Sequence, residues 1–240
     1  MKKIFDYFDS RYRDSIMNKP VSEDGPVITI SRLTGCDARQ VAEYVVANLN
    51  RKFATNKWKW IDKDIIYNIA KELNTEPERV ENFYKGMELS NLSEMIMAFS
   101  GNFISDLRVK KAIRDVVLAM CKEGHIVLVG RGGVSIAHEI RDSLHIRLVA
   151  PFYWRGENIM KKKNMEIEPA EEFVVETDEK RFNLIQTFLD KKPLTIDYLF
   201  DATINRASFS MEETAEMIAE MYARKITRII LEKNKLRSGD

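Results

Sequence analysis

Residues 27–42 read Val-Ile-Thr-Ile-Ser-Arg-Leu-Thr-Gly-Cys-Asp-Ala-Arg-Gln-Val-Ala. The first five are an apolar, β-branched run typical of a buried parallel strand. Gly35 indicates a turn, and the apolar spacing from residue 38 to about residue 52 predicts an amphipathic helix. A strand, a glycine loop and a helix in this order are typical of a phosphate-binding loop, and the rest of the chain can be placed around this unit.

The loop departs from the usual phosphate-binding pattern, G-x-x-x-x-G-K-[ST]. Arg32 and Asp37 stand at the two glycine positions, Ala38 at the lysine position and Arg39 at the hydroxyl position. Two like charges about 4 Å apart repel by ~4 kcal/mol at an effective dielectric constant of about 20. We therefore expect Asp37 to turn outward and cap the following helix, which would leave the site weakened rather than abolished.

Composition limits the class of protein. The chain has 240 residues, 45% of them apolar and 31% charged, which suits one α/β domain with insertions. With 38 basic and 37 acidic residues, net charge predicts neither a nucleic-acid nor a membrane partner. No run approaches the ~20 apolar residues that span a bilayer, and the first residues do not resemble a signal peptide. We expect a cytoplasmic location with reduced cysteines.

Hydrophobic patterning predicts strands that alternate with helices, which is typical of a parallel sheet with right-handed crossovers. The predicted strands are residues 27–31, 58–61, 125–129, 144–150 and 201–205. Further helices are expected at 63–73, 104–122, 133–141, 152–164, 168–190 and 210–233. Ser210 and Glu213 have the spacing of a capping box at the start of the last helix.

Taken together, these segments resemble the cytidylate-kinase-like family of nucleoside monophosphate kinases. The resemblance rests on residues 28–35, 61–66, 127–133, 144–151, 177–181 and 198–205, whose order and spacing hold from about residue 26 to 225. It implies an α/β, P-loop kinase-like three-layer fold in which helices flank a five-stranded parallel sheet. From the residues themselves we expect an N-terminal helical extension and linker, 1–25, before one domain, 26–240. In that domain the resemblance implies a helical acceptor-binding insertion at 62–123 and a lid at 152–190.

The resemblance also implies an activity, which is phosphoryl transfer from ATP, with Mg²⁺, to a nucleoside monophosphate. The donor nucleotide would be held by the loop, at Ser31, Arg32, Thr34, Gly35, Cys36, Asp37, Ala38 and Arg39. Arg32 or Arg39 could replace the missing lysine, because a guanidinium grips two phosphate oxygens. The alternative is that both arginines are solvent-exposed residues at a helix end.

The remaining candidate residues follow later strands. The acceptor would contact Asp62 and Arg131, although Asp62 could equally cap a helix and Arg131, in a Gly-Arg-Gly-Gly turn, could pair with a carboxylate. The candidate catalytic residues are Arg131, Arg155, Asp178 and Arg181. Asp178 could orient an arginine over the transferring group, or it could form with Arg181 an ordinary surface ion pair worth ~0–1 kcal/mol.

Other features are given structural roles. His125 and His145 border buried strands and are expected to be structural, and residues 161–163, three lysines, are expected to form a solvated face. A lowered pKa of the Cys36 thiol is conceivable at a helix N-terminus. The altered loop also favours an alternative function, a nucleotide-binding or regulatory protein with weakened catalysis. Residues 1–25 and 86–103 leave room for a homodimer.

Overall fold

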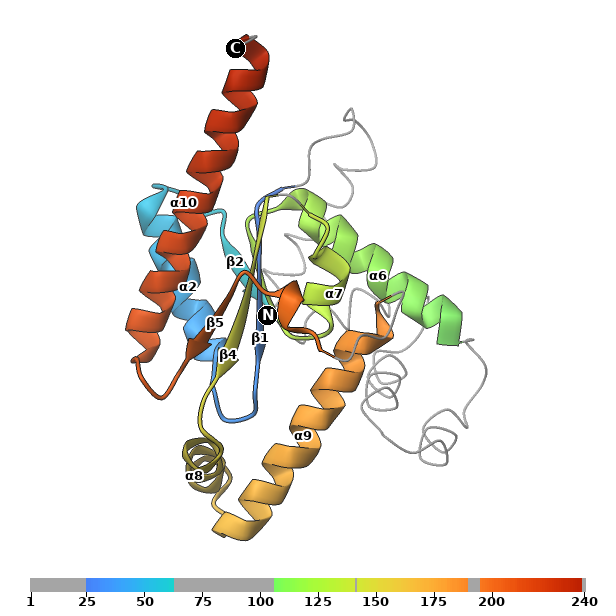
Figure 1. Ribbon diagram of the computed structural model, residues 1–240, viewed down its shortest axis with the longest axis vertical. Coiled ribbons are helices and arrows are strands. Elements are labelled where there is room, and N and C mark those ends of the chain that lie inside the picture. The colour runs from blue at the N-terminus through green and yellow to red at the C-terminus, as the bar shows by residue number, and fades with distance from the viewer. Residues whose placement is uncertain (1–24, 63–105, 141, 190–194, 239–240) are drawn as a thin grey trace.

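A five-stranded, all-parallel sheet forms the centre of the protein (Figure 1). The computed structural model describes residues 25–62, 106–140, 142–189 and 195–238. The strands are β1 (Val27–Arg32), β2 (Lys59–Ile61), β3 (Ile126–Val129), β4 (Ser143–Val149) and β5 (Ala202–Asn205). Their order in the sheet is β2-β3-β1-β4-β5. The predicted strands are therefore confirmed, each to within one residue at either end.

β1 is the central strand of the sheet, and its apolar sequence explains why it lies in this central position. It pairs with β3 on one side and with β4 on the other, so that Ile28 lies between Val127 and Leu144. Ile28 and Ile30 are fully buried on one face of the sheet, and Val27 is fully buried on the other. An apolar, β-branched run suits a strand covered on both faces.

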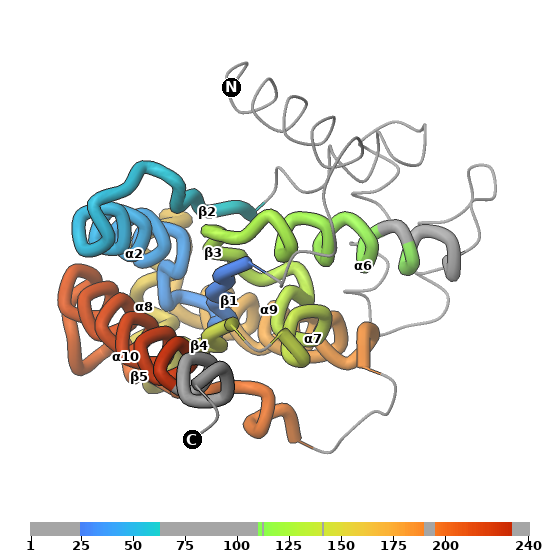
Figure 2. Tube along the Cα trace, turned by 90° about the horizontal axis from the view of Figure 1, so that it is seen from above, coloured from blue at the N-terminus to red at the C-terminus, as the bar shows by residue number. Residues whose placement is uncertain are grey.

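Helices cover both faces of the sheet, as the view along it shows (Figure 2). On one side lie α2 (Ala38–Lys52) and α10 (Met211–Ser238), and on the other lie α6 (Asp106–Glu123), α7 (Gly133–Ala137) and the end of α9 (Ile167–Thr187). Tyr222 of α10 fills the first interface and stacks edge-on against Trp58, with ring centroids 5.0 Å apart. The resulting arrangement has three layers.

Two helix ends show how local chemistry sets the boundaries. The predicted capping box is confirmed, since the Ser210 N–H donates to Glu213 Oε2 at 2.8 Å and the Glu213 N–H donates to Ser210 Oγ at 3.1 Å. The helix predicted over residues 133–141 instead ends at Ala137. There the Ile140 N–H bonds to the Ala137 carbonyl, an i→i−3 turn that does not continue the helix.

The helices predicted as the lid pack on each other where the strands end. They are α8 (Phe152–Lys163) and α9, joined through the buried side chains of Ile159, Ala170 and Val174. Figure 1 shows α8 below the loop that connects β1 to α2, while α9 begins below this loop and rises past it. Residues 1–24 of the predicted extension and 63–105 of the predicted insertion lie outside the described residues. Within the ranges that are described, none of the helices combines the length and apolarity that crossing a membrane requires.

Candidate active site

The loop after β1 lies against the first turn of α8. Gly35 has φ = 89°, in the left-handed region that favours glycine. A Cβ added there would lie 2.8 Å from the Arg155 backbone oxygen and 3.0 Å from its Cα. Because both neighbours are backbone atoms, they cannot move aside cheaply. Gly35 therefore allows α8 to approach the loop closely.

Asp37 does not cap α2, and this prediction was wrong. It has φ = 46°, a left-handed conformation unlike the extended backbone of most N-cap residues, and its side chain makes no hydrogen bond to the helix start. Its Oδ1 instead lies 2.5 Å from Lys162 Nζ of α8. In the part of the chain that the structure describes, the N-cap residue of α2 therefore provides no side-chain cap, and uncapped N–H groups at a helix start favour an anion.

A cleft of about 370 Å³ opens at this helix start. It is lined by residues of the loop, α2, α8 and α9, namely Arg32, Leu33, Thr34, Gly35, Cys36, Asp37, Ala38, Arg39, Gln40, Ile159, Lys162, Lys163, Phe173 and Arg181. The lining includes every predicted donor-nucleotide residue except Ser31, which is buried in β1. The structure thus brings the predicted loop residues to one cleft, together with lid residues.

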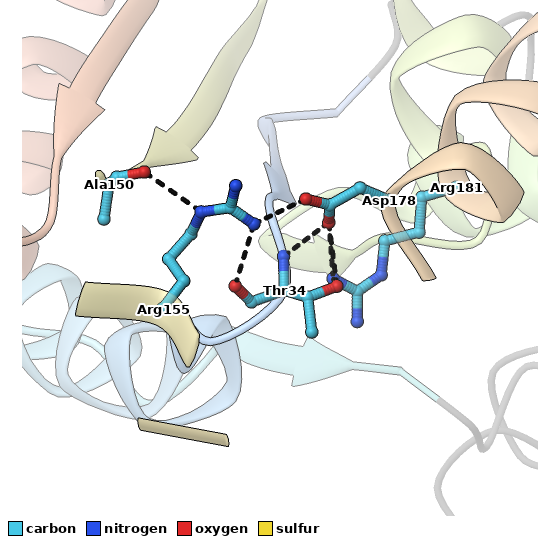
Figure 3. A network of polar contacts seen from close by, with 5 residues as sticks. All are labelled: Thr34, Ala150, Arg155, Asp178 and Arg181. Carbon is cyan, nitrogen blue, oxygen red and sulfur yellow. Dashed lines mark hydrogen bonds and ion pairs between the residues drawn. The ribbon is translucent and has the colours of Figure 1, made fainter. Parts of the chain in front are cut away.

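Asp178 ties α9 to the loop (Figure 3). Its Oδ1 accepts hydrogen bonds from the Thr34 backbone N–H at 2.6 Å and from the Thr34 hydroxyl at 2.8 Å. Arg181 Nη1 donates to the same hydroxyl oxygen at 2.9 Å and lies 3.8 Å from Asp178 Oδ1. Asp178 and Arg181 therefore both bind Thr34 of the loop. They are not simply the surface ion pair that their i, i+3 spacing suggested as an alternative.

Arg155 completes the network from α8. Its Nε donates to the Ala150 carbonyl at 3.0 Å, and its Nη1 lies 2.5 Å from Asp178 Oδ2 and 3.4 Å from the Thr34 carbonyl (Figure 3). The residue is buried. Because its guanidinium bonds to Ala150 after β4, to the loop and to α9 at once, Arg155 fixes α8 and α9 against the loop.

Arg32 is surrounded by other cations. Burial is the largest cause that lowers the pKa of its guanidinium to about 9; repulsion from Arg181, Arg131 and Arg39 also lowers it, and Asp62 raises it. The side chain lies over Gly130, where an added Cβ would come within 1.9 Å of Arg32 Nη1. Arginine stays protonated in proteins, so the lowered pKa indicates that positive charge is disfavoured at this position.

Asp62 directly follows β2 and is buried. It forms an ion pair with Arg39 Nε, and its Oδ1 lies 3.8 Å from Arg131 Nε. The pairing of Arg131 with a neighbouring carboxylate, the alternative reading from sequence, is thus present. The helix that Asp62 could cap lies outside the described residues. The two predicted acceptor residues, Asp62 and Arg131, therefore lie close together, and Asp62 is joined to the loop region by its ion pair with Arg39.

Two buried side chains, Cys36 and His145, are not suited to act as reactive groups. Burial raises the pKa of the Cys36 thiol to about 12, so the lowered value considered from sequence is wrong. His145 bonds to the Thr29 and Ser143 hydroxyls, each at 2.8 Å, and burial lowers its pKa to about 4. The prediction of a structural His145 is supported by these contacts.

Sequence reasoning missed the polar face that α8 presents to the loop. Asn158 Nδ2 donates to the Gly35 carbonyl at 3.2 Å, and Lys162 contacts Asp37. Residues 161–163 are exposed as expected, yet the ammonium of Lys163 also lies 4.4 Å from the Phe173 ring centroid. The spacing of Arg155, Asn158 and Lys162 at i, i+3 and i+7 was the available signal, although it does not reveal what the face contacts.

The parallel sheet, the glycine loop after its central strand and the two helices that close against this loop define a P-loop kinase-like α/β fold. The model of the family described as the cytidylate kinase-like family matches residues 27–208, and the chain belongs to that family. Membership supports a nucleotide kinase-like function.

Solved structures and a curated relative are also similar. An uncharacterized protein from Eubacterium ventriosum is 12% identical with a TM-score of 0.57, over 82% of this chain and 98% of that one, which supports the fold. A shikimate kinase from Bacteroides thetaiotaomicron is 10% identical with a TM-score of 0.45, over 82% and 97% of the two chains. A uronate isomerase from Corynebacterium glutamicum is 26% identical over 140 residues. That match covers 58% of this chain but only 26% of the relative's length.

Proposed function

We propose that this protein transfers a phosphoryl group from ATP to a nucleoside monophosphate, as a member of a nucleotide kinase-like family. The observation that carries the proposal is the convergence of an uncapped helix start with Arg32 and Arg181 on one cleft. A polyphosphate bound there would receive backbone N–H groups and cationic side chains together.

The electrostatics of Arg32 support an anionic ligand. Burial and the neighbouring Arg181, Arg131 and Arg39 all disfavour its charge, and the Asp62 carboxylate opposes them. A phosphate group bound in the cleft would bring negative charge close to Arg32. Its binding would therefore offset the free energy that burial and the neighbouring arginines cost the Arg32 charge. Phosphoryl transfer depends mainly on such positioning and charge neutralisation.

The residues present fit ATP better than they fit a separate metal. The hydroxyl residue that normally follows the loop lysine is replaced by Arg39, whose guanidinium pairs with Asp62. No three His, Cys, Asp or Glu side chains lie close enough to hold a metal, as far as the described residues extend. Mg²⁺ commonly binds through substrate phosphates, so we assign it to the nucleotide, where it would neutralise charge on the transferring group.

We propose separate roles for the arginines and for Asp62. Arg32 and the loop would hold the donor phosphates, and Arg181 would reach the transferring group from α9. Asp62 and Arg131, at the ends of β2 and β3, would face the acceptor. Arg155, predicted as catalytic, is proposed as a positioning residue, because its guanidinium is buried and bonded to Asp178 and the loop.

A second candidate is a nucleotide-binding protein with weak catalysis. It is favoured by Asp37 and Ala38 at positions where the usual loop has glycine and lysine. Both candidates require ATP to bind in the same cleft, and they differ only in turnover.

An assay of ADP formation from ATP and Mg²⁺ against a panel of nucleoside monophosphates tests the proposal. We expect turnover with CMP or UMP, and its loss in Arg181→Ala. The control is Arg224→Ala, which removes an exposed arginine of α10 that pairs with Glu220. ATP binding without turnover on any monophosphate would instead support the second candidate.

A further inference from the structure

The phosphate-binding loop has no lysine of its own, because Ala38 occupies that position. The cleft nevertheless contains two lysines, Lys162 and Lys163, both contributed by α8. Lys163 lies against the Phe173 ring. Lys162 reaches the loop itself, with its Nζ 2.5 Å from Asp37 Oδ1.

We propose that Lys162 is the phosphate-binding lysine of this site, supplied by the lid instead of the loop, and that Asp37 positions it. This inference rests on the proposed function, because it assigns a residue to the donor-phosphate site. It explains why the loop differs from the usual pattern at two adjacent positions. Ala38 stands where the lysine is missing, and Asp37 supplies a carboxylate that holds Lys162 in its place.

The geometry of α8 supports this assignment. Arg155, Asn158 and Lys162 lie on one face of the helix, at i, i+3 and i+7. They contact the Thr34 carbonyl, the Gly35 carbonyl and the Asp37 carboxylate, in the same order along the helix as along the loop. The helix therefore runs beside the loop, and its last contact places an ammonium group at the start of α2.

The ion pair is poorly explained as a stabilising contact. The Lys162 side chain is 63% exposed and the Asp37 side chain 21% exposed, and exposed pairs of this kind contribute little to stability. Lysine has a flexible stem and a rotatable ammonium with three donors. It can therefore move from one carboxylate to a more highly charged polyphosphate in the same cleft.

The backbone of Asp37 is consistent with a replaced glycine. Its φ of 46° lies in the region where glycine carries no steric penalty and where aspartate is one of the few other residues found. The loop thus follows the course that a glycine would allow, and the added side chain leaves the helix start and meets Lys162.

The test is calorimetric titration of ATP and Mg²⁺ into the wild type and Lys162→Met, with Lys161→Met as the matched control one position earlier and outside the cleft lining. We expect Lys162→Met to weaken ATP binding about 10- to 100-fold, the loss of one hydrogen bond to a charged group. Lys161→Met should change it less than about 2-fold, and Lys162→Arg should retain most of the affinity. Equal binding by the wild type and Lys162→Met would overturn the inference while leaving the proposed function standing.

The Asp37→Asn variant distinguishes two possible roles of Lys162, which are binding phosphate directly and only neutralising the Asp37 carboxylate. If Lys162 binds phosphate, Asp37→Asn with Lys162→Met should remain about 10-fold or more weaker than Asp37→Asn alone. Equal affinities in the double variant and in Asp37→Asn alone would overturn the inference, because they would show that the lysine only cancels a repulsive carboxylate. A wild-type protein that binds no ATP would defeat the proposed function and this inference together. Circular dichroism of each variant checks that it folds.

Discussion

Asp178 binds Thr34 through two hydrogen bonds to one carboxylate oxygen, from the backbone N–H at 2.6 Å and from the hydroxyl at 2.8 Å. These residues are 144 positions apart in the chain. The contact joins α9 to the loop between β1 and α2, and the other carboxylate oxygen accepts a hydrogen bond from Arg155 of α8. Helices α8 and α9 and the loop therefore share one carboxylate.

Removing that carboxylate should destabilise the protein. Asp178→Ala leaves the largely buried Arg155 guanidinium without its carboxylate partner, and we expect a loss of about 2–3 kcal/mol in the free energy of unfolding. Glu176→Ala on the same helix is the control, because its exposed pair with Lys180 is worth under about 0.5 kcal/mol. Urea denaturation measures both, and equal losses would show that the network has no structural role.

Arg32 should be needed for anion binding and not for folding. Pyrophosphate at about 100 times its Kd should raise the Tm of the wild type by about 5 °C at constant ionic strength. Arg32→Gln should lose most of this shift and keep, or exceed, the Tm of the wild type without pyrophosphate, because burial and nearby arginines oppose the charge. A large fall in Tm without pyrophosphate would mean that Arg32 is instead a structural residue.

Gly130→Ala should act on the same site through Arg32. The residue has φ = 70°, which costs an L-residue about 1–2 kcal/mol, and the new Cβ would displace the Arg32 guanidinium. We expect ATP affinity, measured by calorimetry, to fall about 10-fold. Gly133→Ala is the matched control, since its Cβ meets Leu128 at an ordinary 3.5 Å. Similar affinities in the two variants would contradict the proposed position of Arg32.

Stability should fall in mild acid because of His145. Burial lowers its pKa from 6.5 to about 4, so the folded protein keeps the ring neutral while the unfolded chain gains a proton. The stability contributed by the neutral ring is complete above pH 6.5 and is lost progressively as the pH falls toward 4, by roughly 3 kcal/mol in total. Denaturation at a series of pH values measures this slope. His145→Gln should flatten it, and an unchanged slope would assign it to other groups.

The sheet could be predicted from sequence because its signals are local. Strand β1 is a run of apolar, β-branched residues, and Ser210 with Glu213 forms a capping box within one helical turn. The end of α7 was predicted less well, since an i→i−3 turn at Ile140 replaces its last turn and no glycine or proline marks the position.

The candidate site was predictable where its residues are contiguous. Residues of the loop such as Arg32 and Gly35 line one cleft because they follow a single strand. The partner of Asp37 was not predictable, because a lysine 125 positions away is one of many that could neutralise it. The position of Arg155 also depends on how α8 packs against the loop, and not on its own neighbours in sequence.

The proposed function depends most directly on whether the altered loop holds ATP. Calorimetric titration of the wild-type chain with ATP and Mg²⁺ should show saturable binding of about one nucleotide per chain, weakened at least about 10-fold by Arg32→Gln, which removes a charge-assisted contact. The absence of any binding heat, together with an unchanged Tm in the presence of ATP, would contradict a phosphate site in this cleft.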